Sequence, residues 1–404
     1  MAWKTTNEMN ERVRFIASYL EEEQTFSELC LEFGISRKTG YKWVERYGDG
    51  GVEALQNRSR APHRHPQQVG EEILDKLLAV RRKHPFWGPK KLIAVVAREN
   101  PLLILPVAST VGEILRKRGL VKPKRRRRVS SPYQDRLIEY QGPNDLWCAD
   151  FKGHFATGAE RCHPLTITDG YSRYLIMCHG QSRPLYQQTR KTFERAFHEY
   201  GLPATIRTDN GAPFSTLAPG GLSLLSVWWI KLGIRPERIM PGRPDQNGQH
   251  ERMHSTLKAE TARPARGSLR AQQRAFDRFQ CEYNEQRPHE ALGQKVPADF
   301  YKKSPRRYPG KIPDLEYPSH FRLERTYPNG VISFGSTQWY LSGCLKGEVV
   351  GLEEVSDGRW KVYFGQIPLG LIDLRNINPR KSRHFGYLIR YDGERTYDRR
   401  RRKR

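Results

Sequence analysis

The chain has 404 residues, enough for about two to four domains that each bury a core of their own. Its 70 lysines and arginines against 44 aspartates and glutamates give a formal charge of +26, which points to a polyanionic partner. No apolar run approaches the roughly 18 residues that span a bilayer, so the composition excludes a membrane-spanning protein, and no secretory signal is expected.

The first sixty residues predict a helix-turn-helix. Apolar residues recur at helical spacing over 10–20, and residues 25–48 indicate two further helices. Ser27 is expected to cap the first of these two, Gly34 to form the turn, and Ser36 to cap the second. Such a second helix presents its N-terminal end to base edges, and an ordinary helical hairpin is the alternative. The candidate DNA contacts are Arg37, Lys38, Thr39 and Lys42.

Basic segments flank the next predicted domain. The linker 57–70 is rich in Arg, His and Pro and suits an extended arm along a DNA groove. Helical patterns over 71–85, 84–97 and 107–120, the last with a capping residue, predict a second helix-turn-helix-like unit. Residues 116–128 hold nine basic residues in thirteen, and a run between two domains is expected to lie on phosphates. The candidate DNA contacts in these segments are Arg58, Arg60, Arg125 and Arg126.

From about residue 143 the pattern changes to strands and helices. Strands are expected over 146–155, 163–169, 171–180, 204–211 and 233–240, and helices over 184–201 and 268–293. Beyond about residue 315, short alternating strands with PNG and SDG turns predict a small barrel.

Three acids stand out in this part of the chain. Asp150 lies in an otherwise apolar strand, Asp209 follows a strand in the turn TDNG, and Glu251 lies near the start of a helix. Each has a structural alternative: a buried acid with a backbone partner, a turn residue, and a solvated surface charge, respectively. A carboxylate in an apolar strand is costly unless it is paired or binds a metal. Three carboxylates brought together by a sheet and a helix would form a site for Mg²⁺ or Mn²⁺.

The helix that carries Glu251 is expected to have two faces. Met253 and Leu257 point toward a core. The opposite face is expected to carry Glu251, His254, Ser255 and Lys258.

The segments WCADFKG, TDNGAPF and GRPDQNGQHERMHSTLK, in this order, resemble the D, D and E motifs of DDE transposases and retroviral integrases. The chain most resembles bacterial insertion-sequence transposases with an integrase core, since YNEQRPHEAL and PADFY are similar to the sequence after the core in those transposases. The resemblance covers about 5–380. It implies a ribonuclease-H-like core in which Asp150, Asp209 and Glu251 are catalytic and bind two Mg²⁺ or Mn²⁺ ions when DNA is bound. It also implies that Lys258 contacts the transposon end and that the C-terminal β region is an SH3-like barrel.

Two departures from the family pattern are visible. Asp209 and Glu251 are 42 residues apart (251 − 209), which is longer than typical, and the extra length around 215–225 indicates a Gly/Pro loop. The chain also lacks the zinc module of retroviral integrases, and its helix-turn-helix units favour an insertion-sequence enzyme. A fourth acid, Asp169, is interpreted as a structural strand-end residue that forms a salt bridge to Arg173.

The predicted fold is therefore multidomain: all-α helix-turn-helix units, an α/β ribonuclease-H-like core, and a small all-β SH3-like barrel. The predicted boundaries are 1–56 for the helix-turn-helix, 57–70 for a basic linker, 71–122 for the second such unit, 123–142 for another basic linker, 143–303 for the core, 315–380 for the barrel and 381–404 for a basic tail.

The expected function is that of a transposase that binds the terminal inverted repeats of its element, cuts DNA strands and joins the 3′-hydroxyl ends to target DNA. The resemblance implies a homo-oligomer on DNA ends and a bacterial cytoplasmic, nucleoid-associated location. The six cysteines are scattered singly without a CxxC pair, which favours a reducing compartment and disfavours a zinc site. One alternative is a non-catalytic DNA-binding regulator that kept the fold, which the three acids disfavour. Another is a plain ribonuclease-H-like nuclease, which would not need the upstream units.

Overall fold

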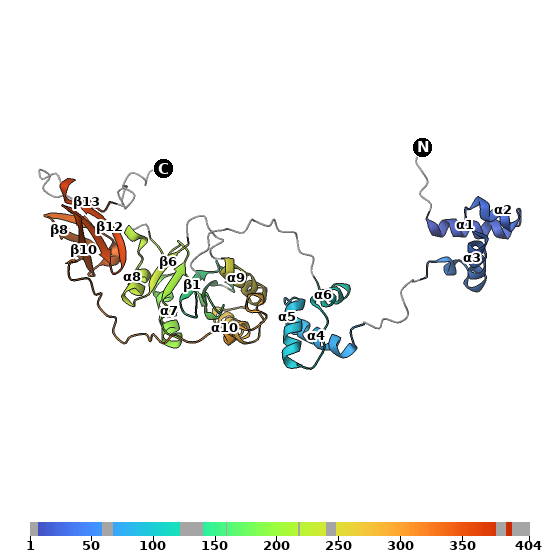
Figure 1. Ribbon diagram of the computed structural model, residues 1–404, viewed down its shortest axis with the longest axis horizontal. Helices are drawn as coiled ribbons and strands as arrows, with labels where there is room; N and C mark the ends of the chain where they lie inside the picture. The colour runs from blue at the N-terminus through green and yellow to red at the C-terminus, as the bar shows by residue number, and fades with distance from the viewer. Residues whose placement is uncertain are drawn as a thin grey trace. The chain divides into compact units, whose positions relative to one another are not determined.

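The structure is a computed structural model, and Figure 1 shows the order of its elements along the chain. It describes residues 7–58, 68–121, 140–158, 160–216, 219–239, 248–376 and 385–389. The chain divides into two compact units, 1–69 and 70–404. Within the described residues, none of the helices combines the length and the apolar character needed to cross a membrane. All six cysteines lie in the described part, and each is a free thiol.

The first unit is a three-helix domain that contains the predicted helix-turn-helix. Its helices are α1 (Glu8–Glu21), α2 (Phe26–Glu32) and α3 (Arg37–Gly50). Gly34, at φ +62°, forms the turn, and the Ser36 hydroxyl accepts a hydrogen bond from the Thr39 N–H at 3.2 Å, so both predictions are confirmed. The predicted cap of α2 is wrong, because Thr25 and not Ser27 precedes the helix. Thr25 and Glu28 form a reciprocal capping box, which satisfies two N–H groups at once.

Helices α2 and α3 cross closely at Gly40. The core of this unit is built from Phe15, Ile16, Leu29, Cys30, Trp43 and Leu55. A Cβ atom on Gly40 would lie 2.8 Å from the Cys30 Sγ and 2.9 Å from the ring of Phe26. Gly48, on the same helix, has no neighbouring atom within 4 Å of such a Cβ. Packing therefore requires a small residue at Gly40 and not at Gly48.

The second unit begins with three helices, α4 (Glu71–Lys83), α5 (Pro89–Glu99) and α6 (Ala108–Lys117). Helix α5 begins at Pro89 and not at residue 84, because a proline is accommodated in the first turn and residues 84–88 form a connection. Helix α6 follows Val107 without a side-chain cap, so the predicted capping residue is absent. The His84 Nδ1 lies 2.8 Å from a Glu282 carboxylate oxygen, which links these helices to the domain that follows.

A mixed sheet with the strand order β4-β3-β1-β5-β6 forms the centre of that domain, and β2 extends it beside β3. Strands β4, β3 and β1 are antiparallel neighbours, whereas β1, β5 and β6 run parallel. The strands are β1 (Leu146–Phe151), β2 (Phe155–Thr157), β3 (Glu160–Asp169), β4 (Leu175–Gln181), β5 (Thr205–Thr208) and β6 (Arg235–Arg238). The single strand predicted over 146–155 is thus two strands, with Gly153 at φ +69° between them. Strand β4 begins later than predicted because residues 170–174 turn the chain.

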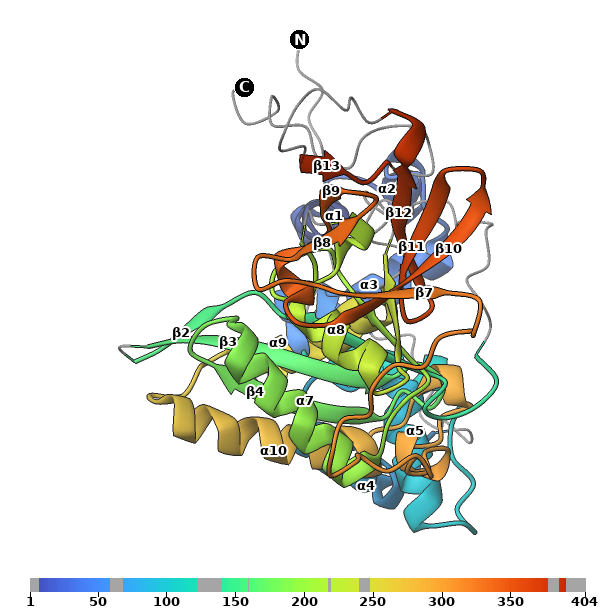
Figure 2. The ribbon, with the colours of Figure 1, turned by 90° about the vertical axis from the view of Figure 1, so that its left-hand side faces the viewer.

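Helices cover both faces of this sheet (Figure 2). On one face, α7 (Tyr186–Tyr200) and α8 (Leu224–Lys231) bury a core that includes Phe193, Phe197 and Trp229. On the other, α9 (Gly248–Thr261) and α10 (Leu269–Glu285) bury Met253 and Phe276. The arrangement confirms the ribonuclease-H-like core as an α/β domain whose sheet lies between helices.

Helix α10 also covers the outer edge of β4 with three amide side chains. Asn284 accepts a hydrogen bond from one backbone N–H and donates to the carbonyl of the same residue, at 2.8 and 3.0 Å. Gln280 donates to a carbonyl at 2.9 Å, and Gln273 both accepts from an N–H and donates to a carbonyl at 2.9 Å. The backbone groups they bind belong to Leu175, Ile176, Cys178 and Gly180. These side chains take the place of a neighbouring strand.

The C-terminal part is all β, as predicted, and forms two sheets. The first has the order β12-β11-β10-β7 and the second β13-β9-β8. The strands are β7 (Arg322–Arg325), β8 (Val331–Phe334), β9 (Thr337–Tyr340), β10 (Val349–Ser356), β11 (Arg359–Phe364), β12 (Ile367–Asp373) and β13 (Phe385–Tyr387). Val227 and Ile230 of α8 join their apolar core, and Lys231 forms a salt bridge to Glu348 at 2.9 Å. The sheets establish the all-β class, whereas a closed SH3-like barrel stays a prediction.

Candidate active site

Two of the three predicted acids lie side by side at the ends of two neighbouring strands of the sheet. Strands β1 and β5 are parallel, and Ala149 pairs with Thr208. Asp150 and Asp209 each follow these paired residues, so both lie at the carboxyl ends of neighbouring strands. Glu251 lies in the first turn of α9, which packs on the same sheet.

The pKa of Asp150 is affected by both of the other acids. Burial raises the pKa of Asp150 from 3.8 to about 7, the charge of Asp209 raises it next, and Glu251 raises it to a smaller extent. Burial also raises the pKa of Asp209, although an N–H from Gly211 at 3.2 Å opposes the change. Bringing these carboxylates together therefore costs free energy that a bound cation would recover.

Two buried histidines attach α9 to the sheet beside Asp150. The Thr166 Oγ1 lies 2.6 Å from the His250 Nε2 and 2.7 Å from the His254 Nε2, and it donates to the Asp150 carbonyl at 3.2 Å. The Thr168 Oγ1 lies 3.0 Å from the His250 Nδ1. The His254 Nδ1 is 3.7 Å from the Asp150 Oδ2, so this imidazole lies between the carboxylate and Thr166. Burial lowers the pKa of His250 to about 3 and that of His254 to about 2, which keeps both rings neutral.

These histidines and threonines are the residues that the sequence interpretation missed. His254 was expected on the face that carries Glu251, but it is buried against the sheet, whereas Glu251, Ser255 and Lys258 are exposed. The signal was present in two patterns, histidines four residues apart on a helix and threonines two apart on a strand. Each pattern places its two side chains on one face.

The carboxylates suit a hard divalent cation by their chemistry. Carboxylate oxygens are the donors that Mg²⁺ and Mn²⁺ prefer. Among the residues that the structure describes, no three His, Cys, Asp or Glu side chains are close enough together to hold a metal ion. Residues 240–247, which directly precede α9 and include the GRPDQN segment, lie outside the described part. The donor set therefore fits the ion, although the side chains described here are not gathered into a metal site.

The fourth acid, Asp169, has a different environment. It is buried and accepts hydrogen bonds from the Asn144 N–H at 2.7 Å, the Ser172 N–H at 2.7 Å and the Ser172 hydroxyl at 2.6 Å. These bonds close the turn between β3 and β4. The predicted salt bridge is wrong: these groups are the partners of the Asp169 carboxylate among the described residues, whereas Arg173 donates its backbone N–H to the Asp169 carbonyl at 3.1 Å.

The candidate DNA contacts of the first unit lie on one exposed helix end. Arg37, Lys38 and Lys42 of α3 are exposed, whereas Thr39 is half-buried and its hydroxyl lies 3.0 Å from that of Ser36. Arg58 is exposed beyond this domain. Three further candidates lie outside the described residues: Arg60, Arg125 and Arg126.

Four family models match the chain. A helix-turn-helix domain matches residues 11–63, and a homeodomain-like domain matches residues 39–115. Integrase core domains match residues 141–244 and 232–297, and the first of these ranges contains Asp150 and Asp209 while the second contains Glu251.

Relatives of the chain occur in bacterial insertion elements. The uncharacterized 31.7 kDa protein of insertion element IS407 from Burkholderia multivorans is 27% identical over 59% of this chain and 83% of its own length. The uncharacterized 39.2 kDa protein of IS476 from Xanthomonas euvesicatoria is 27% identical over 61% of this chain and 70% of its own length. These matches confirm the resemblance to insertion-sequence proteins with an integrase core.

Solved structures of retroviral integrases are also similar. The HTLV-2 integrase catalytic core domain in complex with magnesium, in its trimeric form, has a TM-score of 0.32 and 16% identity, over 40% of this chain and 98% of that chain. A chain of the simian T-cell lymphotropic virus intasome has a TM-score of 0.35 and 17% identity, over 76% of this chain and 100% of that chain.

Proposed function

We propose that this chain, which carries the integrase core and helix-turn-helix domains of an insertion-sequence transposase, binds the terminal inverted repeats of its element, cleaves DNA strands and joins their 3′-hydroxyl ends to target DNA. The observation that carries the proposal is the position of Asp150. It is a half-buried acid in the central strand β1 of an integrase core domain, Asp209 directly follows the neighbouring strand β5, and Glu251 contributes to the raised pKa of Asp150.

Asp150, Asp209 and Glu251 are the proposed ligands of Mg²⁺ or Mn²⁺, with two ions when DNA is bound. When bound, such ions activate the attacking water or hydroxyl and stabilise the leaving oxygen of the phosphodiester. The chain's own groups hold this arrangement in place. His250 and His254 fix the first turns of α9, and thereby Glu251, against the strand that pairs with Asp150.

DNA is the proposed partner along much of the chain. The exposed end of α3 would read base edges of the inverted repeat through Arg37, Lys38 and Lys42. Lys258, exposed two turns beyond Glu251, would contact a phosphate of the DNA end. We further propose that the C-terminal sheets form the SH3-like barrel that the resemblance implies, and that several copies assemble on paired DNA ends.

The test compares strand-joining rate with end-binding affinity in matched variants. Glu251→Gln, Asp150→Asn and Asp209→Asn should each lower joining by several orders of magnitude and leave end binding nearly unchanged, because these acids act as one unit. Asp169→Asn removes a charge from an acid that closes a turn, so the folded variant should keep most of its joining activity. A wild-type joining rate for Glu251→Gln, or loss of joining in folded Asp169→Asn alone, would refute the assignment.

Two further measurements separate the proposal from its alternatives. Joining should require Mg²⁺ or Mn²⁺, and activity that persists in excess EDTA would contradict the metal-dependent mechanism. A protein that binds the repeats but neither cuts nor joins them under any metal condition would be a DNA-binding regulator instead.

A further inference from the structure

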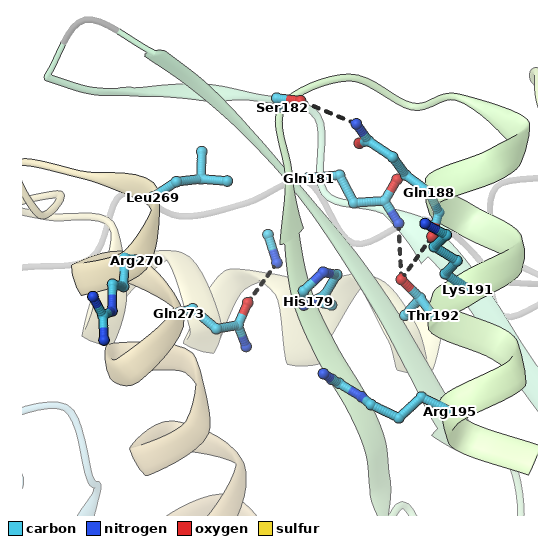
Figure 3. Close-up of a pocket in the computed structure, with 11 residues that line it drawn as sticks. His179, Gln181, Ser182, Gln188, Lys191, Thr192, Arg195, Leu269, Arg270 and Gln273 are labelled. Carbon is cyan, nitrogen blue, oxygen red and sulfur yellow. Dashed lines mark hydrogen bonds between the residues drawn. The ribbon is translucent and has the colours of Figure 1, made fainter. Parts of the chain in front are cut away.

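A cavity of about 540 Å³ opens at the covered edge of β4, between α7 and α10 (Figure 3). Its lining contains no acidic residue. Three of its lining side chains are cations, Lys191 and Arg195 from α7 and Arg270 from α10, and Figure 3 shows them on two sides of the opening. The other lining residues include three glutamines, a serine and a threonine.

The three cations are not neutralised within the described part of the chain. None of them forms a salt bridge there, and the Arg195 guanidinium contacts the Met177 sulfur at 2.7 Å, which is a weak acceptor. An acid nearby on α10, Asp277, accepts a hydrogen bond from Gln273 at 2.8 Å. The His179 Nδ1 is buried at the cavity and has no hydrogen-bond partner among the described residues. The cavity thus offers positive charge that nothing in its lining balances.

The cavity also lies close to the candidate active site. Asp150 pairs with Thr166 on β3, and Thr166 pairs with Cys178 on β4. Neighbouring strands are about 4.8 Å apart, so Cys178 lies roughly 10 Å from Asp150. His179, the next residue, lines the cavity. A DNA duplex, whose major groove alone is about 12 Å wide, can span both places.

We propose that this cavity binds phosphates of the DNA backbone, as a sequence-independent contact beside the catalytic carboxylates. Arginine and lysine donors around an open, acid-free cavity suit phosphate oxygens. The proposal rests on the proposed function only in taking DNA as the partner.

The test uses the full chain and the salt dependence of its binding to a random-sequence duplex. Each phosphate contact contributes about 0.9 to the slope of log K against log salt. The double variant Lys191→Gln/Arg270→Gln should therefore have a slope shallower than wild type by about 1–2. The matched control is Arg307→Gln/Lys311→Gln, which removes the same charge from exposed positions outside the cavity and should keep the wild-type slope.

An equal change in both double variants, or no change in the cavity variant, overturns the proposal. Thermal unfolding checks that both variants fold, and Arg270→Gln alone, with an expected change of about 1, replaces the double variant if it does not. A labelled polyglutamate peptide forms a second arm. If wild type binds it, the cavity variant does not, and the duplex slope is unchanged, the cavity serves an acidic protein partner and the DNA assignment fails. In each of these outcomes the proposed function is still tested separately, by measuring whether the wild type binds the inverted repeats and joins DNA strands.

Discussion

Replacing Asp150 with Asn should stabilise the metal-free protein at neutral and alkaline pH while it abolishes joining. The pKa of this carboxyl is raised from 3.8 to about 7, chiefly by burial and then by Asp209. A change of about 3 units at about 1.4 kcal/mol per unit corresponds to a cost on the order of 4 kcal/mol for holding the charge. The side chain is 18% exposed, so water screens only a small part of this cost.

The direction of the pH dependence of stability depends on whether the folded or the unfolded state binds the proton more tightly. Because the folded pKa is the higher one, the free energy of unfolding of the wild type falls as the pH rises from about 4 to about 7, and it stays lower above that window. Below about pH 4 the carboxyl is neutral in both states, so the cost is absent. The amide that replaces the carboxyl in the variant is neutral throughout, which removes this part of the pH dependence.

Urea unfolding of wild type and Asp150→Asn at about pH 4 and about pH 8, in EDTA, measures the effect. We expect the free energy of unfolding of the variant to exceed that of the wild type by several kcal/mol at the higher pH. At the lower pH the difference between the two should be small. Added Mg²⁺ should stabilise the wild type at the higher pH and leave the variant unchanged. Asp169→Asn is the control: burial raises the pKa of Asp169 as well, but hydrogen bonds from Ser172 and Asn144 oppose the shift. Its amide leaves at least one N–H donor unpaired, a cost of about 1–3 kcal/mol, so this variant should gain less stability at the higher pH than Asp150→Asn.

The reasoning is refuted if Asp150→Asn is less stable than wild type at the higher pH, or if the difference is the same at both pH values. Either result would show that the carboxylate is held by partners that stabilise its charge, as expected for a structural acid.

Two other predictions concern packing around the helices. Thr166→Val removes the hydroxyl that contacts the Nε2 atoms of His250 and His254, so it should lower the free energy of unfolding by about 1–3 kcal/mol. It should also slow joining more than it weakens DNA binding, and a wild-type joining rate would show that α9 is positioned in another way. Gly40→Ala should destabilise the first unit by about 1–3 kcal/mol through overpacking, whereas Gly48→Ala should stabilise it by about 0.5–1 kcal/mol. Calorimetry of the full chain measures both effects, and equal effects would contradict the close crossing of α2 and α3.

Much of the site was predictable because it depends on local and periodic features. The sequence places Asp150 in an apolar strand and Asp209 directly after another strand. The parallel pairing of β1 and β5 then brings the ends of these two strands, and with them the two acids, together. The position of His254 was not predictable in this way. A helical wheel shows which residues share a face, but polar residues can face a core when the sheet beneath supplies hydrogen-bond partners, as Thr166 does.

The helix-turn-helix likewise has features that the sequence predicts correctly and one that it does not. Gly34 and Ser36 were identified correctly because a positive φ and a helix N-cap each have strong residue preferences. Ser27 was predicted as the cap of α2, and serine and threonine are both good cap residues. Thr25 caps the helix because Glu28 completes a capping box with it.

The amides that α10 places along β4 have a consequence for how copies of the protein can meet. An open strand edge is a template to which a strand of another molecule can add. Here Asn284, Gln280 and Gln273 already occupy those backbone groups, so this edge of the sheet cannot be extended from one subunit into the next. Contacts between copies on this side of the core would have to use side chains, whose charges can be changed without disturbing the sheet.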